Sequence, residues 1–231
     1  MSDKFNEFME AHPVGFCKMP PHISRDELLL ASPKFQAPES IDLREYCTPT
    51  EDQGSKPWCA AYAAANWAEN ILWRKTDYVQ QIDPAWIYAH AKSIDGDPNG
   101  DGTTLTAVLE ALLARSVFDP VVCKPKVIRR SREALKYALH RFGAVLGGFN
   151  VTREWYRVGS TKTYISGRDR LPFLGGHAVL VCGYDPFGVI IQNSWSADWG
   201  NYGFAKIMWE EFDRSFMYGS VLSNCLDGLT V

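Results

Sequence analysis

Apolar residues recur at helical spacing in the first part of the chain and at strand spacing in the rest. Leu105, Val108, Leu109 and Leu112 form one stripe at intervals of three and four residues, which predicts an amphipathic helix. Elsewhere, an N-cap residue followed by proline begins a second helix, and an Ala-rich apolar stretch predicts a buried one. The predicted helices cover residues 60–73, 85–94, 104–115 and 131–143.

Beyond Gly143 the apolar segments are short, rich in β-branched or aromatic residues, and separated by Gly, Asp and Pro, which is typical of strands. We expect strands over residues 144–151, 161–166, 177–184, 187–193, 202–208 and 219–225. A helical part followed by a β-rich part predicts an α+β fold with two lobes. The expected divisions are an N-terminal extension over 1–36, a helical lobe over 37–142 and a β-rich lobe over 143–231.

Composition and charge exclude several classes of partner. The chain has 231 residues, 46% of them hydrophobic, which is enough for a large core. A net charge of −3 gives no general attraction to nucleic acid, and no apolar run reaches the roughly 20 residues that span a bilayer. The N-terminus lacks the apolar stretch of a signal peptide. We therefore expect no nucleic-acid partner, no membrane span, and a location in the cytoplasm or on an export route that needs no such signal.

The six cysteines occur singly, without a CxxC pair. Such spacing argues against a structural zinc site and against a dense disulfide framework. If one cysteine is a nucleophile, an odd number remains, so at least one other is a free thiol. A reducing compartment fits this usage best.

Cys59 directly precedes the Ala-rich helix and follows Pro57 and Trp58, so we expect it in the first turn of that helix. Unpaired backbone N–H groups and the helix dipole favour a thiolate there. Gln53, six residues upstream, offers an amide donor for an oxyanion. Most free cysteines are merely small buried hydrophobes, so a catalytic role for Cys59 depends on partners elsewhere in the chain.

Two segments of the β-rich part offer such partners. His177 begins a predicted strand after Gly175 and Gly176, which allow close approach of another backbone. Asn193 ends the next apolar strand. Alone, His177 reads as a structural histidine and Asn193 as a turn residue. Together they supply the two groups that a cysteine nucleophile needs. The imidazole exchanges a proton with the thiol, and the amide fixes the tautomer of the imidazole.

These motifs occur in a familiar order. Gln53-Gly54 with Cys59, Gly176-His177-Ala178, and Asn193-Ser194-Trp195 followed by Trp199-Gly200 and Gly203-Phe204 resemble the papain family of cysteine peptidases. The resemblance covers about residues 41–207 and indicates a divergent, microbial-type member. It implies a helical N-terminal lobe and an antiparallel, β-barrel-like C-terminal lobe, with the active-site cleft between them.

The resemblance also implies the roles of individual residues. Cys59 becomes the nucleophile, His177 the general base and acid, and Asn193 the group that orients His177. Gln53 and the backbone N–H of Cys59 form the oxyanion hole, and Trp195 shields the His177–Asn193 bond from water.

Three small residues complete the expected site. Gly176 supports the approach of a backbone beside His177, Ala178 lies near the specificity pocket, and Gly102 lies at a Gly-rich wall of the cleft. The implied activity is hydrolysis of peptide bonds in proteins or peptides through an acyl-enzyme, without a metal or other cofactor. The alternatives are a transpeptidase or amidase with the same Cys-His-Asn site, and a non-catalytic binding protein that retains the fold.

The chain departs from the family pattern around the nucleophile. The usual Cys-Gly-Ser-Cys-Trp is replaced by Lys56-Pro57-Trp58-Cys59-Ala60, which lacks the upstream cysteine and the following aromatic residue. Trp58 is a candidate to replace the lost bulk from the other side. None of these changes removes a group that the chemistry requires.

Two charged stretches have less specific interpretations. Asp95, Asp97, Asn99 and Asp101 fit the first positions of an EF-hand calcium loop, but Thr106 stands where that loop needs a glutamate. An acidic surface turn beside the cleft is therefore favoured over a calcium site. The basic run over 124–132 predicts a solvated connector between helices.

The N-terminal extension over 1–36 is punctuated by prolines and too short for the family's usual inhibitory prosegment. Ser24 as N-cap and Glu27 three residues later predict one short helix over 24–31. Phe16, Met19 and Ile23 are apolar residues in an otherwise irregular stretch. We therefore expect the extension to wrap the surface or to lie partly in the cleft as a short pro- or lid segment.

Overall fold

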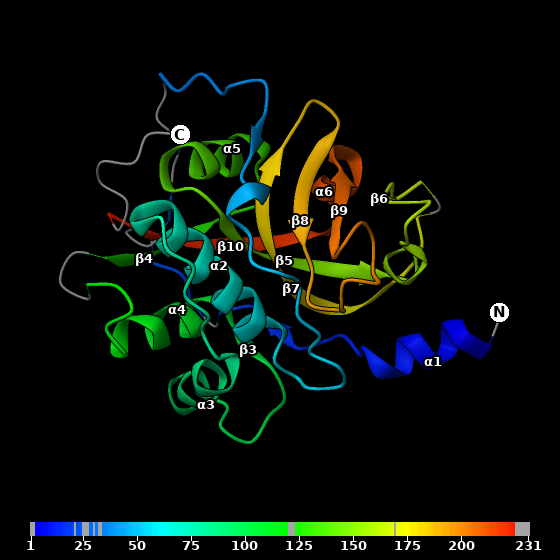
Figure 1. The fold of residues 1–231 in the computed structure, drawn as a ribbon, viewed down its shortest axis with the longest axis horizontal. Coiled ribbons are helices and arrows are strands. Elements are labelled where there is room, and N and C mark those ends of the chain that lie inside the picture. The colour runs from blue at the N-terminus through cyan, green and yellow to red at the C-terminus, as the bar shows by residue number, and fades with distance from the viewer. Residues whose placement is uncertain are drawn as a thin grey trace.

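The computed structural model describes residues 3–20, 22–24, 28, 29, 31, 34–119, 123–168 and 170–224. Within these residues the chain forms a group of helices packed beside one large sheet (Figure 1). The helices are α1 (Asp3–Ala11), α2 (Cys59–Thr76), α3 (Pro84–Ile94), α4 (Leu105–Ala114), α5 (Arg132–Phe142) and α6 (Trp209–Ser215), with the short turns η2 (Arg44–Tyr46) and η3 (Trp155–Arg157).

The four predicted helices are confirmed as α2 to α5, and their ends have the expected chemistry. The Asp83 side chain accepts from the Ala85 N–H at the start of α3, where Pro84 occupies the first turn. Ser131 caps α5 in the same way, and Gly143 ends it with a positive φ of 81°. Helices α1 and α6 were not predicted from the sequence.

The sheet has eight strands in the order β4-β10-β5-β7-β8-β9-β6, and β2 pairs with β7 at its side. Its pairings are antiparallel except for the short parallel contact of β6 with β9. The strands are β2 (Ile41–Asp42), β4 (Lys124–Ile128), β5 (Val145–Thr152), β6 (Tyr164–Ile165), β7 (Phe173–Tyr184), β8 (Gly188–Gln192), β9 (Phe204–Met208) and β10 (Phe216–Ser223). This architecture confirms the predicted α+β class.

Two predictions for irregular segments were wrong. The basic run expected as a connector contains β4, an edge strand that pairs with β10. Edge strands commonly carry lysines, so a basic composition does not exclude one. The expected helix over 24–31 is contradicted at Leu28, which forms a β-bridge with Val127. Residues 25–27 and 30 of that prediction lie outside the described residues.

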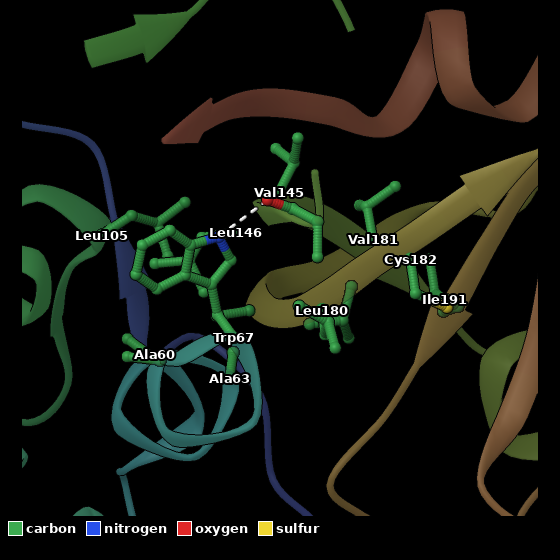
Figure 2. Packing of buried hydrophobic residues seen from close by; sticks show 14 of the residues in the cluster. Ala60, Ala63, Trp67, Leu105, Val145, Leu146, Leu180, Val181, Cys182 and Ile191 are labelled. Atoms are coloured by element: carbon green, nitrogen blue, oxygen red, sulfur yellow. Dashed lines mark hydrogen bonds between the residues drawn. The ribbon is translucent and has the colours of Figure 1, made fainter. Parts of the chain in front are cut away.

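The core lies between α2 and the middle of the sheet (Figure 2). The α2 face that meets the sheet is built from alanines, and their small side chains let the helix approach β5 and β7 closely. Trp67 fills the remaining space, and its indole Nε1 donates to the Ala144 carbonyl at 2.7 Å. This packing holds the first residue of α2, Cys59, against the central strand β7.

Strand β4 is part of the large sheet, and helix α5 packs on that sheet through contacts with β4, β5, β7 and β10. Both fall inside the range 37–142 that the sequence assigned to the helical lobe, and the lobe boundaries stay a prediction. Among the described helices, none combines the length and apolar character needed to cross a lipid bilayer.

Cys17, Cys47, Cys59 and Cys182 are free thiols, whereas Cys123 is disulfide-bonded. The predicted location in a reducing compartment stays a prediction.

Candidate active site

Cys59 is the first residue of α2, as its position before the Ala-rich stretch predicted. The backbone N–H groups of Ala178 on β7 and Ala60 on α2 lie close enough to its sulfur to act on the pKa of the thiol. Because Ala178 directly follows His177, the thiol lies beside the backbone of the histidine that the sequence paired with it.

His177 and Asn193 are joined as expected. His177 Nε2 lies 2.7 Å from Asn193 Oδ1, and both side chains are buried. Asn193 Oδ1 also accepts from the Ser194 N–H at 2.8 Å, which fixes the amide so that its oxygen faces the imidazole. The other ring nitrogen, Nδ1, has no hydrogen-bond partner among the described residues. A neutral ring that donates from Nε2 keeps the Nδ1 lone pair available to take a proton.

Burial determines the protonation of both groups. It raises the pKa of the Cys59 thiol to about 12, although three backbone N–H groups act in the opposite direction. Burial likewise lowers the pKa of His177 to about 4, against the effect of the Asn193 hydrogen bond. Desolvation thus outweighs the backbone donors at Cys59 and opposes the thiolate expected from the helix terminus. Both shifts favour a neutral thiol and a neutral imidazole.

Gln53 is buried beside this pair and is tied to both neighbouring segments. Its Oε1 accepts from the Ser194 hydroxyl at 2.6 Å, and its backbone N–H donates to the Ser194 carbonyl at 2.9 Å. Its Nε2 donates to the Lys56 carbonyl at 3.1 Å, which leaves one amide N–H of Gln53 for another acceptor. Asp52 and Trp195 form a β-bridge next to these bonds. The loop before Cys59 and the segment after Asn193 thus hold each other in place.

Aromatic rings cover the His177–Asn193 pair. The Trp195 ring centroid lies 4.8 Å from that of His177, and Trp155 meets the imidazole edge-on at 6.1 Å. Both indoles are fully buried. Trp195 thus packs on the imidazole, and its role in keeping water from the His177–Asn193 bond stays a prediction. Tyr156 stacks on Trp195 with a ring-centroid distance of 4.7 Å.

Residues 14–18, which we call the covering segment, pass between the helical part and the sheet. On one side the Gly15 N–H donates to the Gly176 carbonyl at 2.8 Å. On the other side the Thr103 N–H donates to the Phe16 carbonyl at 3.0 Å, and β1 (Cys17–Lys18) pairs with β3 (Thr103–Thr104). The segment thus lies beside the strand that carries His177, and the role of the extension as a pro- or lid segment stays a prediction.

Glycines make room for this segment. A Cβ atom on Gly176 would lie 2.4 Å from the Cys17 carbonyl oxygen, and one on Gly102 would lie 2.0 Å from the Phe16 carbonyl oxygen. Gly102 also has a φ of 70°, which favours glycine. Both glycines that the sequence placed near the cleft therefore border the covering segment.

Helix α1 anchors the segment on the aromatic cluster. The Phe8 ring packs edge-on against the Trp195 ring, with 6.1 Å between the ring centroids. The His12 ring also lies against Trp195, with 5.8 Å between the centroids. His12 Nε2 lies 2.9 Å from Asp52 Oδ1, and the Tyr156 hydroxyl donates to the His12 carbonyl at 2.8 Å. None of these contacts was predicted from the sequence, although Asp52 directly precedes Gln53.

Two lysines bind the carboxylates of the acidic loop. Asp95 accepts from Lys92 at 2.7 Å, and Asp97 pairs with Lys18 of the covering segment at 2.5 Å. In the part of the chain that the structure describes, no group of three His, Cys, Asp or Glu side chains is close enough to hold a metal ion. The loop is an acidic turn that contacts the covering segment, which is the interpretation that the sequence favoured.

Comparisons with known proteins agree with this geometry. The family model described as papain family cysteine protease matches residues 118–220, a stretch that includes His177 and Asn193 but not Cys59. Cathepsin K of Mus musculus is 25% identical over 221 residues, covering 82% of this chain and 66% of that protein. Cathepsin K of Gallus gallus is 26% identical over 200 residues, covering 74% and 59%. The chain thus spans less than two thirds of each of these relatives.

Similar folds occur among solved structures. Xylellain, a cysteine protease from Xylella fastidiosa, superposes with a TM-score of 0.72 at 18% identity, covering 92% of this chain and 97% of that one. Digestive procathepsin L 3 of the Tenebrio molitor larval midgut gives a TM-score of 0.65 at 16% identity, covering 95% and 78%. The chain is therefore papain-like in sequence and in fold, which confirms the family resemblance that its motifs indicated.

Proposed function

We propose that this protein is a cysteine peptidase that hydrolyses peptide bonds through an acyl-enzyme, with Cys59 as nucleophile and His177 as base and acid. One observation carries the proposal. Asn193 binds His177 at Nε2, so that Nδ1 is the nitrogen left to exchange a proton with the thiol that lies against Ala178. A structural histidine in a core would have both nitrogens satisfied.

In the proposed reaction, His177 Nδ1 takes the Cys59 proton and the sulfur attacks the carbonyl carbon of the scissile bond. The remaining Gln53 amide N–H and the Cys59 backbone N–H stabilise the resulting oxyanion. The tetrahedral intermediate collapses as His177 gives the proton to the leaving amine, which leaves a thioester on Cys59. Water, activated by His177, then hydrolyses the thioester and restores the thiol.

We also propose that the described state is latent. The covering segment occupies the space beside Gly176 and Gly102 that a substrate backbone needs, and it buries the thiol and imidazole in their neutral forms. Movement of residues 14–18 would admit water and substrate together, and hydration favours the charged thiolate and imidazolium. Some similar solved proteins are themselves precursors, among them procathepsin L 3 and a stem bromelain precursor.

Labelling with a thiol-directed epoxide, followed by peptide mapping, tests the proposal. The full chain should label slowly at Cys59, and the chain without residues 1–36 should label faster and cleave peptides. Cys59→Ala should abolish both, whereas Cys47→Ser, a change at a thiol outside the site, should leave both intact. If the shortened protein folds and its Cys59 reacts no faster, the latency proposal fails.

The same experiment separates the other activities. A transpeptidase would pass the acyl group to an added amine, and mass spectrometry would then detect an amide product instead of a free carboxylate. A binding protein would hold peptide without product and without selective labelling at Cys59. Hydrolysis that depends on Cys59 is the result that the peptidase proposal requires.

A further inference from the structure

Two free thiols lie together at a place away from the candidate active site. Cys47 follows the turn η2, and Cys182 lies in the central strand β7. Strand β2 brings them together, because Asp42 pairs with Gly183 and the Leu43 N–H donates to the Cys182 carbonyl at 2.8 Å. The turn η2 then folds the chain back, so that the Cys47 sulfur lies 3.6 Å from the Leu43 carbonyl oxygen. The Cys182 sulfur lies 3.7 Å from the Ile190 carbonyl oxygen, and the two thiols are close enough to interact electrostatically.

The surroundings of this pair suit thiol chemistry. Arg44 lies close enough to interact electrostatically with both sulfurs, and its guanidinium is itself paired with Asp42 at 2.6 Å. Asn70 Nδ2 also donates to the Cys47 sulfur at 3.6 Å. Cys47 is partly exposed, whereas Cys182 is fully buried. Burial and the neighbouring Cys47 raise the pKa of Cys182 well above its ordinary value. An external reagent therefore meets Cys47 first.

We propose that Cys47 and Cys182 form a reversible disulfide in exchange with low-molecular-weight disulfides. The Cys47 thiolate attacks one sulfur of the reagent RSSR, forms a mixed disulfide and releases RS⁻. Cys182 then loses its proton and attacks the Cys47 sulfur, which displaces the second RS⁻. Two protein thiols are oxidised by two electrons, and RSSR is reduced to two RSH once the thiolates take up the two protons.

The bond would join two parts of the molecule that meet only through non-covalent contacts at this point. Cys47 belongs to the segment that leads into α2. In this segment the Thr48 hydroxyl donates to the Glu69 carboxylate, and the Thr48 carbonyl accepts from the Gln192 amide at 2.7 Å. Cys182 lies five residues after His177 on the same strand. The disulfide would close the loop over residues 48–181 and restrict the unfolded chain. Loops of this length predict a rise in melting temperature of about 5–15 °C.

The site goes beyond the proposed peptidase function, because it needs neither Cys59 nor His177. The test uses the full chain with Cys59→Ala, which removes the active-site thiol from competition. This protein is incubated with oxidised glutathione, digested without reductant and mapped by mass spectrometry. We expect a cross-linked peptide that joins Cys47 to Cys182 and a rise in melting temperature, both reversed by dithiothreitol.

Variants give the matched controls. Cys47→Ser should lose the cross-link and the stabilisation, and Cys17→Ser, at another buried free thiol, should retain both. Cys182→Ala is a second variant if Cys47→Ser does not fold. A stable glutathione adduct on Cys47 with Cys182 still reduced would overturn the proposal, as would an unchanged rise in melting temperature in Cys47→Ser.

Discussion

Ser194 donates its hydroxyl to the side-chain oxygen of Gln53 at 2.6 Å, across the boundary between the segment after Asn193 and the loop before Cys59. The residue that follows the histidine-orienting amide therefore also holds the amide expected in the oxyanion hole. The Gln53 motif and the Asn193-Ser194 motif, which were separate in the sequence analysis, therefore form one hydrogen-bonded unit. Its rigidity fixes the direction of the Gln53 amide donors before substrate arrives.

Replacing Ser194 should therefore weaken catalysis without removing a reacting group. Ser194→Ala frees the Gln53 side chain, and we expect kcat to fall by about 10-fold with KM nearly unchanged, because the oxyanion forms only during the reaction. Steady-state kinetics on an uncovered form of the protein measure this. Ser196→Ala, which removes an exposed hydroxyl that accepts from Asp198, is the control. A loss carried by KM instead of kcat would contradict the positioning role.

A methyl group at Gly176 should open the site. The added Cβ would lie 2.4 Å from the Cys17 carbonyl oxygen, so Gly176→Ala is incompatible with the covering segment but compatible with an empty cleft. We expect at least a 10-fold faster reaction of Cys59 with an epoxide inhibitor. Gly159→Ala is the matched control, because nothing lies within 4 Å of its added Cβ. Equal labelling rates in the two variants would show that the segment does not limit access.

Removing the Phe8 ring should also release the covering segment, although Phe8 lies outside that segment on α1. Phe8 is the residue of α1 that packs on both Trp195 and Tyr156. Its loss should weaken docking of the helix by about 1–3 kcal/mol, since a partly buried aromatic ring is lost. Hydrogen exchange of α1 amides should increase in Phe8→Ala, and Cys59 should react faster. Glu7→Ala, an exposed neighbour on the same helix, should behave as the unmodified chain does.

Acid should destabilise the covered state through His177. Burial lowers the pKa of His177 from 6.5 to about 4, so the unfolded chain binds a proton between these pH values and the folded chain does not. The stability contributed by the neutral ring is present above pH 6.5 and is lost as pH falls toward 4, by about 3 kcal/mol. Chemical denaturation from pH 7 to pH 4.5 should show this loss, and His177→Gln should reduce it. Parallel pH profiles for both proteins would refute the assignment.

The comparison of the unmodified protein with His177→Gln ends at pH 4.5 because Glu154 begins to contribute to the pH dependence of stability below that value. Hydrogen bonds from Lys162, Ser166 and Gly167 outweigh its burial and lower the pKa of Glu154 to about 2. Its contribution is present above pH 4.5 and is lost as pH falls toward 2. Above pH 4.5 the difference between the two proteins therefore reports on His177.

The parts of this fold that local chemistry determines were predictable from the sequence. Asp83 with Pro84 and Ser131 with Gly143 specify helix ends through hydrogen bonds and φ preferences that involve only nearby residues. The motif around Cys59 likewise placed the thiol at a helix terminus. The short helix α1 was missed because its apolar residues have a partner only when Trp195 and Tyr156, far along the chain, form their surface.

The state of the site was less predictable than its members. Position in the first turn of α2 favours a Cys59 thiolate, and that inference is sound for an exposed helix terminus. The covering segment reverses it by removing water, and nothing in the residues around Cys59 signals this burial. Gly102, Gly175 and Gly176 were the available hints, since each leaves room for the backbone of another segment.

The catalytic role of Cys59 is best tested by measuring peptide hydrolysis by Gly176→Ala, with and without Cys59→Ser in the same chain. We expect Gly176→Ala to release new amino termini from a peptide mixture, and we expect the added Cys59→Ser to abolish their release. Cleavage that persists after Cys59→Ser would contradict it. So would a folded Gly176→Ala protein whose uncovered Cys59 reacts with the epoxide while no peptide is cleaved.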